Sequence, residues 1–181
     1  MTETLAQETA VTIRKARPED GRHIWQTVAD SGRLDVNSAY CYIMLAAYFK
    51  DTCLVAELDG RIVGFVSAFI QPSDREVLFV WQIAVSRDYR KRGIADSLLS
   101  SLIALDRCRE VRYIEATISP DNAASHRLFA GLADRLGTRR TVASGFAAEL
   151  FPGSQHEAEQ LVRIGPLGSQ SNRTNTNKGE S

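Results

Sequence analysis

The chain has 181 residues, 44% of them hydrophobic, which fits one domain with a sizeable core. Its 22 basic residues equal its 22 acidic residues, so no overall field would hold nucleic acid or an anionic membrane surface. Any site for an anion must therefore be local.

Hydrophobic periodicity and turn residues predict the elements in chain order. Residues 1–10 are expected to be flexible, and the domain is expected to span residues 11–166. Strands are predicted at 11–15, 53–58, 61–70, 78–85 and 111–118, helices at 19–30, 38–49, 94–107 and 122–136, and one or two further strands within 139–164. Asp59-Gly60 predicts a hairpin turn, and Asn122 a helix cap.

This order of elements predicts an α/β (α+β) fold, a mixed and mostly antiparallel sheet covered by about four helices. The tail 167–181 is polar apart from Leu167, so it is predicted to be disordered. No apolar run approaches the ~18 residues that a membrane span needs, and the first ten residues do not have the pattern of a leader. A cytoplasmic protein is expected.

The cysteines predict no metal site. Cys41, Cys53 and Cys108 form no C-x-x-C pair and lie far apart in the sequence. Neither a zinc site nor a disulfide framework is therefore expected, and the three side chains are interpreted as reduced thiols of the core.

A basic turn stands between the strand 78–85 and the helix that begins at Ile94. Its sequence RKRGIA, residues 90–95, fits R-x-x-G-x-A. Backbone N–H groups at a helix start can converge on an anion, although a run of charges alone is more often a solvated loop. Downstream, PDNAASHRLF, residues 120–129, opens the next helix. Together the two segments resemble the cofactor site of the GCN5-related N-acetyltransferases (GNAT).

The resemblance implies acetyl-CoA as co-substrate and a sheet whose central strand pair is splayed. N–H groups from Lys91 through Asp96 would then meet the pyrophosphate, with charge supplied by Arg90 and Arg92. The pantetheine arm would pair with the splayed strand like an added strand, and an N–H near Ile83 would face the developing oxyanion. The cofactor-binding residues implied are Ile83, Ala84, Val85, Arg90, Lys91, Arg92, Gly93, Ile94, Ala95, Asp96 and Asn122.

Four longer segments, 34–42, 78–85, 114–125 and 151–166, resemble a subfamily whose substrate is L-2,4-diaminobutyrate. The resemblance implies acetylation of its γ-amine, which yields the precursor of ectoine. Two other functions stay open: acetylation of another short diamine, such as ornithine or a polyamine, and a non-catalytic acetyl-CoA sensor. A small-molecule partner is expected, and a homodimer is left open.

The proton acceptor cannot be copied from the wider family. Ribosomal-protein acetyltransferases of this fold use a Glu five residues before the cap Asn and a Tyr seven after it, where this chain has Thr117 and Phe129. Glu115 shares a strand face with Thr117, so it is the predicted base, directly or through water. The alternative is an ion pair with Arg112 or Arg127. For the acid, Tyr40, His126 and the departing thiolate stay open.

The substrate needs a carboxylate, an aromatic wall and a partner for its own carboxylate. The substrate-binding residues predicted are Asp35, Tyr40, Trp81, Thr117 and His156. Four of them have a structural alternative: Asp35 as a helix N-terminal acid, Tyr40 and Trp81 as core aromatics, and His156 as a surface histidine.

Overall fold

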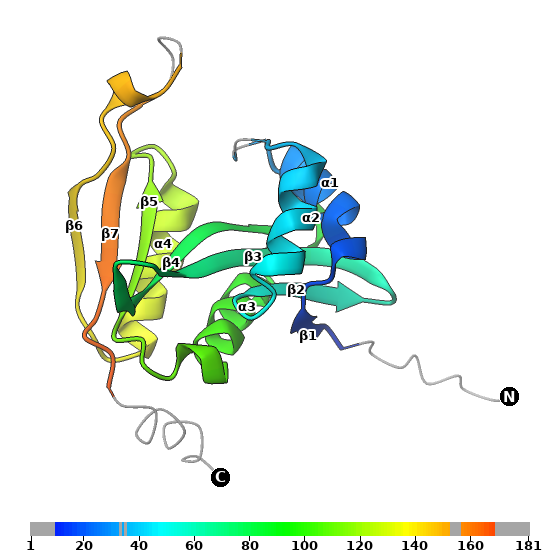
Figure 1. Cartoon of the computed structure of the whole chain (residues 1–181), viewed down its shortest axis with the longest axis horizontal. Coiled ribbons are helices and arrows are strands. Elements are labelled where there is room, and N and C mark those ends of the chain that lie inside the picture. Colours follow the sequence, from blue (N-terminus) through cyan, green and yellow to red (C-terminus); the bar gives the residue numbers. More distant parts are fainter. Residues whose placement is uncertain (1–9, 33, 35, 153–156, 169–181) are drawn as a thin grey trace, which may run out of the picture.

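The computed structural model describes residues 10–32, 34, 36–152 and 157–168. Seven strands form one sheet in the order β1-β2-β3-β4-β5-β7-β6 (Figure 1). They are β1 (Thr12–Lys15), β2 (Cys53–Leu58), β3 (Arg61–Gln71), β4 (Asp74–Val85), β5 (Tyr113–Ile118), β6 (Arg140–Ser144) and β7 (Gln160–Ile164). Among the described strands only the β4–β5 pair is parallel, which confirms the mixed, mostly antiparallel sheet.

In the described part of the chain, four α-helices cover the two faces of the sheet. They are α1 (Gly21–Ser31), α2 (Ala39–Tyr48), α3 (Ile94–Ile103) and α4 (Ala123–Arg135). Helices α1 and α2 pack on one face in a core cluster that includes Val28, Tyr42 and Phe65. Helices α3 and α4 pack on the other face around Leu98, Leu99 and Leu132. Among the described residues, no helix combines the length and apolar character that crossing a bilayer requires.

The predicted elements are present with shifted ends. Asp59 (φ 51°) and Gly60 (φ 73°) form the predicted turn between β2 and β3. Helix α3 ends at Ile103 rather than at Arg107, because the chain turns into a short 3-10 helix at Asp106–Cys108. Strand β4 begins at Asp74, four residues early, since it continues into a tight hairpin with β3.

The domain also extends past its predicted end. Leu167 is 6% exposed, packs in the core of the α3–α4 face, and donates its backbone N–H to Arg112 O at 2.7 Å. The predicted tail boundary at residue 167 is therefore wrong, because the one aliphatic residue of that segment is buried. The predicted flexible residues 1–9 and tail residues 169–181 lie outside the described residues.

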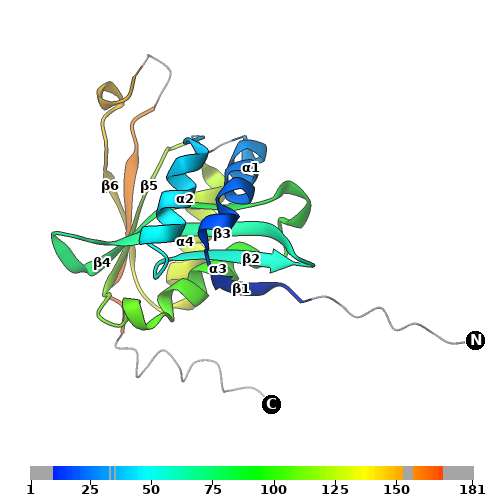
Figure 2. The same ribbon diagram turned by 45° about the vertical axis from the view of Figure 1, so that its right-hand side comes forward.

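Two irregularities interrupt the sheet near its centre. Strands β4 and β5 pair only at Val77–Phe79 with Tyr113–Glu115, and beyond these residues they separate. The register of β3 and β4 shifts by one residue, because Ser67 faces Gln82 whereas Ala68 faces Val80. Trp81 is thus the extra residue of a β-bulge. Figure 2 shows β6 and the orange β7 side by side at one edge of the sheet, next to β5.

Candidate functional site

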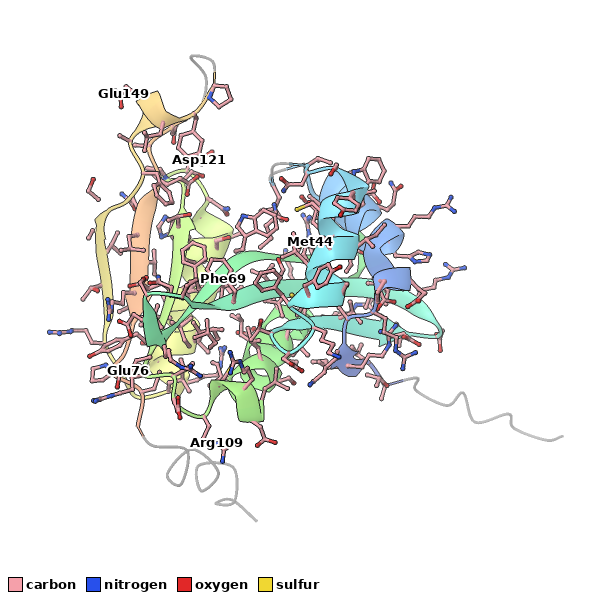
Figure 3. All side chains as sticks on the ribbon, viewed as in Figure 1. Met44, Phe69, Glu76, Arg109, Asp121 and Glu149 are labelled. Atoms are coloured by element: carbon pink, nitrogen blue, oxygen red, sulfur yellow. The ribbon has the colours of Figure 1, made fainter. Side chains whose placement is uncertain are left out.

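A cleft of about 1170 Å³ lies on the α1–α2 face of the sheet. Its sides are the α1–α2 connection, the β3–β4 hairpin, the ends of β4 and β5, and the long β6–β7 connection. Figure 3 labels two side chains from its lining, Phe69 of β3 and Asp121 after β5. The lining residues are Gly32, Leu34, Asn37, Phe69, Gln71, Pro72, Ser73, Phe79, Trp81, Gln82, Thr117, Ser119, Asp121, Asn122, Phe146, Phe151, Glu157 and Glu159.

The bulge explains how two consecutive residues of β4 reach the cleft. Side chains alternate between faces in a regular strand, yet Trp81 and Gln82 both line the cleft. Trp81 is half-buried and also packs against the α1–α2 core cluster, so the pocket and core interpretations of this residue both apply. Gln82 is 7% exposed and accepts a hydrogen bond from the Tyr42 hydroxyl at 3.1 Å.

Tyr40 does not line the cleft, and it is not a core aromatic. It is 73% exposed on α2, whereas Tyr42 is 1% exposed and reaches the site through Gln82. Two residues along a helix are turned by about 200°, so Tyr40 and Tyr42 face opposite sides of α2. Of the other predicted substrate residues, Trp81 and Thr117 line the cleft, and Asp35 and His156 lie outside the described residues.

Glu115 is held by two hydrogen bonds. Its Oε2 accepts from Gln71 Nε2 at 2.8 Å, and its Oε1 accepts from Arg163 Nη1 at 2.9 Å. The side chain is 7% exposed and does not line the cleft. This geometry favours the ion-pair alternative for Glu115, but with a third arginine: Arg163 faces it across the β5–β7 register.

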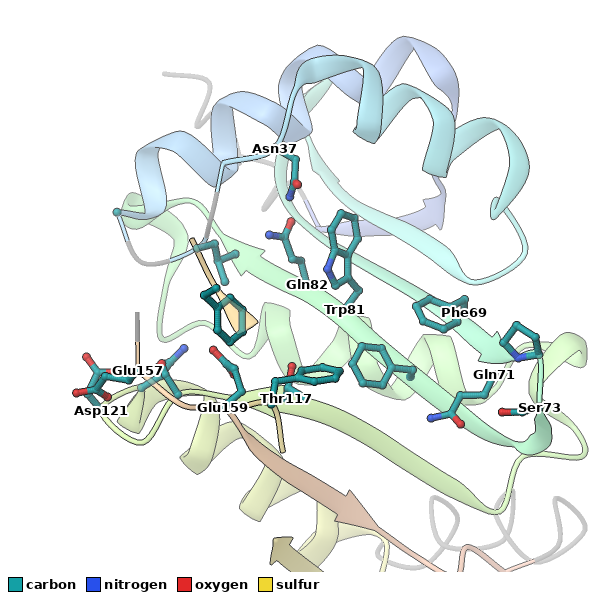
Figure 4. A pocket seen from close by; sticks show the side chains of 18 residues that line it. Asn37, Phe69, Gln71, Ser73, Trp81, Gln82, Thr117, Asp121, Glu157 and Glu159 are labelled. Carbon is teal, nitrogen blue, oxygen red and sulfur yellow. Dashed lines mark hydrogen bonds between the residues drawn. The ribbon is translucent and has the colours of Figure 1, made fainter. Parts of the chain in front are cut away.

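Another carboxylate takes the place in the cleft that was expected for Glu115. Glu159 precedes β7, where Leu161 faces Thr117, so residue 159 belongs to the same face of the sheet as Thr117. Both line the cleft, and Asp121 and Glu157 lie nearby (Figure 4). Of the other groups considered for proton transfer, His126 is half-buried on α4 and does not line the cleft. Phe129 is 2% exposed in the core.

The cleft favours cations. Its described lining contains three carboxylates, those of Asp121, Glu157 and Glu159, and no Lys, Arg or His. The sequence did not single out Gln82, Asn37, Phe69 or Gln71, which also line it. A signal was present for Gln82, because it is a lone amide in the apolar strand FVWQIAV.

The basic turn has the backbone geometry of an anion site. Lys91 (φ 61°) and Gly93 (φ 74°) adopt left-handed conformations, and no side chain caps the N-terminus of α3. The N–H groups of the first helical turn have no acceptor within the helix. A Cβ built on Gly93 meets nothing within 4 Å, so the surface above it is open. Residues 91–96 therefore fit a phosphate group.

Arg90, Arg92 and Asp96 of the turn have defined partners. Arg90 Nε donates to Val85 O at 3.1 Å, and Arg92 lies over the Tyr89 ring at 5.3 Å. The acid of the first helical turn, Asp96, forms an ion pair with Arg135 at 2.6 Å. Lys91 is exposed at the turn. Asn122 caps α4 as predicted, because its Oδ1 accepts from Ser125 N at 3.1 Å.

Comparison with known proteins agrees with this geometry. Residues 19–132 match the Acetyltransferase (GNAT) family. The L-2,4-diaminobutyric acid acetyltransferase of Halalkalibacterium halodurans is 49% identical over 160 residues, 88% of this chain and 84% of that protein. The enzyme of the same name from Shouchella clausii is 46% identical over 165 residues, 91% of this chain and 92% of its own.

A solved structure is similar over nearly the whole fold. It is the diaminobutyrate acetyltransferase of Paenibacillus lautus in complex with its substrate L-2,4-diaminobutyric acid and coenzyme A, at 47% identity and a TM-score of 0.86. The match covers 90% of this chain and 98% of that one. The chain therefore belongs to the GNAT acetyltransferase family and, within it, to the L-2,4-diaminobutyric acid acetyltransferases.

Proposed function

We propose that this chain transfers the acetyl group of acetyl-CoA to the γ-amine of L-2,4-diaminobutyrate, giving the open-chain precursor of ectoine. One observation carries the proposal. The splayed β4–β5 pair separates an acidic, aromatic cleft from a basic turn that fits a phosphate. An amine and a thioester can therefore approach each other from opposite sides of one opening. The Paenibacillus lautus relative, described with both ligands, supports the choice of substrate.

Acetyl-CoA would be held by the backbone. N–H groups of residues 91–96 would receive the pyrophosphate, with Lys91 and the neighbouring arginines supplying charge. Ile83, Ala84 and Val85 pair with β3 on one edge, and β5 has left their other edge, so the pantetheine arm can add there as a strand. The Ile83 N–H is the proposed donor to the oxyanion, and Asn122 would border the arm where it reaches the cleft.

Diaminobutyrate carries two ammonium groups and one carboxylate, which suits a cleft rich in carboxylates. Trp81 and Thr117 would flank the reacting nitrogen. On the basis of the sequence, Asp35 is the proposed partner of the α-ammonium group and His156 that of the α-carboxylate. A site that clamps the α-groups leaves the γ-nitrogen to meet the thioester, which is the basis for the proposed regiochemistry.

The amine must lose a proton, because an amine of pKa ~10.4 is neutral in only about one molecule in 2,500 at pH 7. We infer that Glu159, rather than Glu115, accepts it directly or through one water, since Glu159 lines the cleft. The nitrogen then attacks the thioester carbon, the N–C bond forms and the C–S bond breaks. The departing thiolate takes up a proton, so the products are free CoA and the N-acetylated amine, which is an amide.

A homodimer is proposed from the composition of α2. Its sequence AYCYIMLAAY contains no charged residue, so the face turned away from the sheet is as apolar as the buried one. Tyr40 is 73% exposed, Tyr48 80% and Ile43 39%. A second copy of the chain is the proposed cover for this α2 face, formed by Tyr40, Ile43 and Tyr48. Both protomers are proposed to work in the cytoplasm.

The proposal is tested by release of free thiol from acetyl-CoA with diaminobutyrate, followed by NMR of the product. The expected result is substrate-dependent release and an acetyl group on the γ-nitrogen. No release above background would favour a non-catalytic acetyl-CoA sensor. An α-acetyl product would overturn the proposed clamp while leaving the acetyltransferase assignment in place.

A further inference from the structure

The cleft has two chemically different ends, which Figure 4 shows on either side of Trp81 and Thr117. Asp121, Glu157 and Glu159 lie at the acidic end. Phe69, Phe79, Gln71 and Ser73 line the other, called here the aromatic end. The cleft volume of about 1170 Å³ greatly exceeds that of one diaminobutyrate molecule, and the proposed contacts of that substrate leave the aromatic end unused.

Gln71 lines the aromatic end with its amide group held in one orientation. Its Nε2 donates to Glu115 Oε2 at 2.8 Å, and a carboxylate can only accept, so the amide nitrogen must face Glu115. The amide oxygen is thereby turned away from Glu115. Glu115 is itself fixed by Arg163, which lies 3.9 Å over the Tyr113 ring. The carboxylate thus positions the amide, and Arg163 is held away from the cleft.

The two phenylalanines add a surface that attracts cations. Phe69 and Phe79 face each other across β3 and β4 with ring centroids 5.3 Å apart, and both are half-buried. The faces of aromatic rings attract an ammonium group within about 6 Å of the centroid. No Lys, Arg or His is among the described residues lining the cleft, so none of these described side chains repels such a group. A primary ammonium on an alkyl chain matches this combination of rings and a carbonyl oxygen.

We propose that the aromatic end binds the distal ammonium of linear diamines whose two nitrogens lie farther apart than those of diaminobutyrate. The enzyme would then also acetylate amines of this class. The inference rests on the proposed function, because it uses the same acetyl donor and the same opening. Phe79 precedes Trp81 by two residues, a span of at most about 6.6 Å because Trp81 is the bulge residue of the strand. That span is comparable to the distance between the nitrogens of putrescine or cadaverine and exceeds the reach of the shorter diaminobutyrate.

The reaction is the same acetyl transfer. The distal nitrogen stays protonated over Phe69 and Phe79, and the other nitrogen loses its proton beside Trp81. That nitrogen forms the N–C bond as the C–S bond breaks, and the thiolate takes up a proton. The products are CoA and a mono-acetylated diamine.

A chain-length series tests the proposal on the full-length enzyme. Thiol release is measured with 1,3-diaminopropane, putrescine and cadaverine, and with diaminobutyrate in parallel. We expect kcat/KM to rise at least tenfold from 1,3-diaminopropane to the longer diamines. A flat or falling series, or no diamine turnover while diaminobutyrate is acetylated normally, would overturn the aromatic-end proposal and leave the proposed function standing. Failure with all four substrates would overturn both.

Two variants separate the ends of the cleft. Gln71→Leu keeps the volume of the side chain but removes the acceptor, so it should lower kcat/KM for cadaverine at least ten times more than for diaminobutyrate. Glu159→Gln, at the acidic end, should lower turnover of both substrates, because both need the same proton acceptor. An equal loss on the two substrates in Gln71→Leu would show that Gln71 has no role in the selection of length.

Discussion

Replacement of Gly93 by alanine tests whether the basic turn at residues 90–95 binds phosphate, and the same replacement at Gly60 serves as its control. Gly93 has φ 74°, and a Cβ added there meets nothing within 4 Å. Gly60, in the β2–β3 hairpin away from the cleft, has φ 73° and equally open surroundings. Both substitutions therefore impose the same left-handed strain, about 1–2 kcal/mol for a residue with a Cβ. Neither creates a clash within the protein.

The two variants should lose the same stability but differ in function. For a domain of this size, 1 kcal/mol corresponds to roughly 2–4 °C in Tm, so both should melt about 2–8 °C below the wild type. Only at Gly93 would the methyl group lie where phosphate approaches the backbone. Loss of one hydrogen bond to a charged group costs about 1.5–3 kcal/mol, which corresponds to a rise in the KM for acetyl-CoA of about 10- to 100-fold.

The assay is steady-state thiol release with acetyl-CoA varied at saturating diaminobutyrate, together with thermal melts of both variants. Gly60→Ala should keep the KM of the wild type for acetyl-CoA. If Gly93→Ala also keeps the KM of the wild type, the turn does not bind the phosphate of acetyl-CoA and the proposed cofactor site is refuted. If both variants show the same raised KM, the effect is one of strain alone.

Three further predictions concern stability, proton transfer and assembly. The Asp20 carboxylate accepts two hydrogen bonds from the Arg14 guanidinium, at 2.7 and 2.9 Å, and one from the Arg17 backbone N–H at 2.8 Å. Burial opposes ionisation of this carboxyl group, but the hydrogen bonds outweigh it and hold the pKa of Asp20 below its ordinary value. Asp20→Asn should therefore lower the free energy of unfolding in urea by about 3 kcal/mol at pH 7. This difference from the wild type should shrink as the pH falls through the lowered pKa of Asp20, and a difference that stays constant with pH would show that the pairing is unimportant. Glu159→Gln should lower kcat by roughly 10²- to 10⁴-fold, and Glu115→Gln much less; the reverse order would restore Glu115 as the base. Tyr40→Lys should convert a dimer to a monomer in light scattering, and a wild-type monomer would exclude the proposed use of the α2 face.

The fold was predictable because its elements have strong local signals. Short apolar runs mark β2 and β3, alternation of apolar and polar residues marks β5, and Asp59-Gly60 marks the turn between β2 and β3. Leu167 was missed because a single leucine in a polar segment gives no periodicity. Its burial depends on a bond to Arg112 O, a contact with a residue far away in the sequence.

The basic turn was predictable from the sequence because its residues lie close together in the chain. The turn at residues 90–95 is local, so its type and position could be read directly. The partner of Glu115 could not be predicted, because the β5–β7 register decides which residue faces it. That residue, Arg163, lies 48 positions after Glu115 in the chain. Tyr40 and Tyr42 are similarly ambiguous in sequence, since only the packing of α2 decides which of them faces the sheet.

The proposed chemistry depends on two places where the sheet loses its regularity. In a regular sheet, β5 would stay paired with β4 beyond Phe79 and leave no edge for a second substrate. Without the bulge at Trp81, strand alternation would turn Trp81 and Gln82 to opposite faces of the sheet. Polarity patterns assume regular strands, so neither feature has a signal in them. The splayed β4–β5 pair, which the family resemblance predicted, and the bulge at Trp81, which no sequence pattern indicated, are the parts of the sheet proposed to bring an amine and a thioester together.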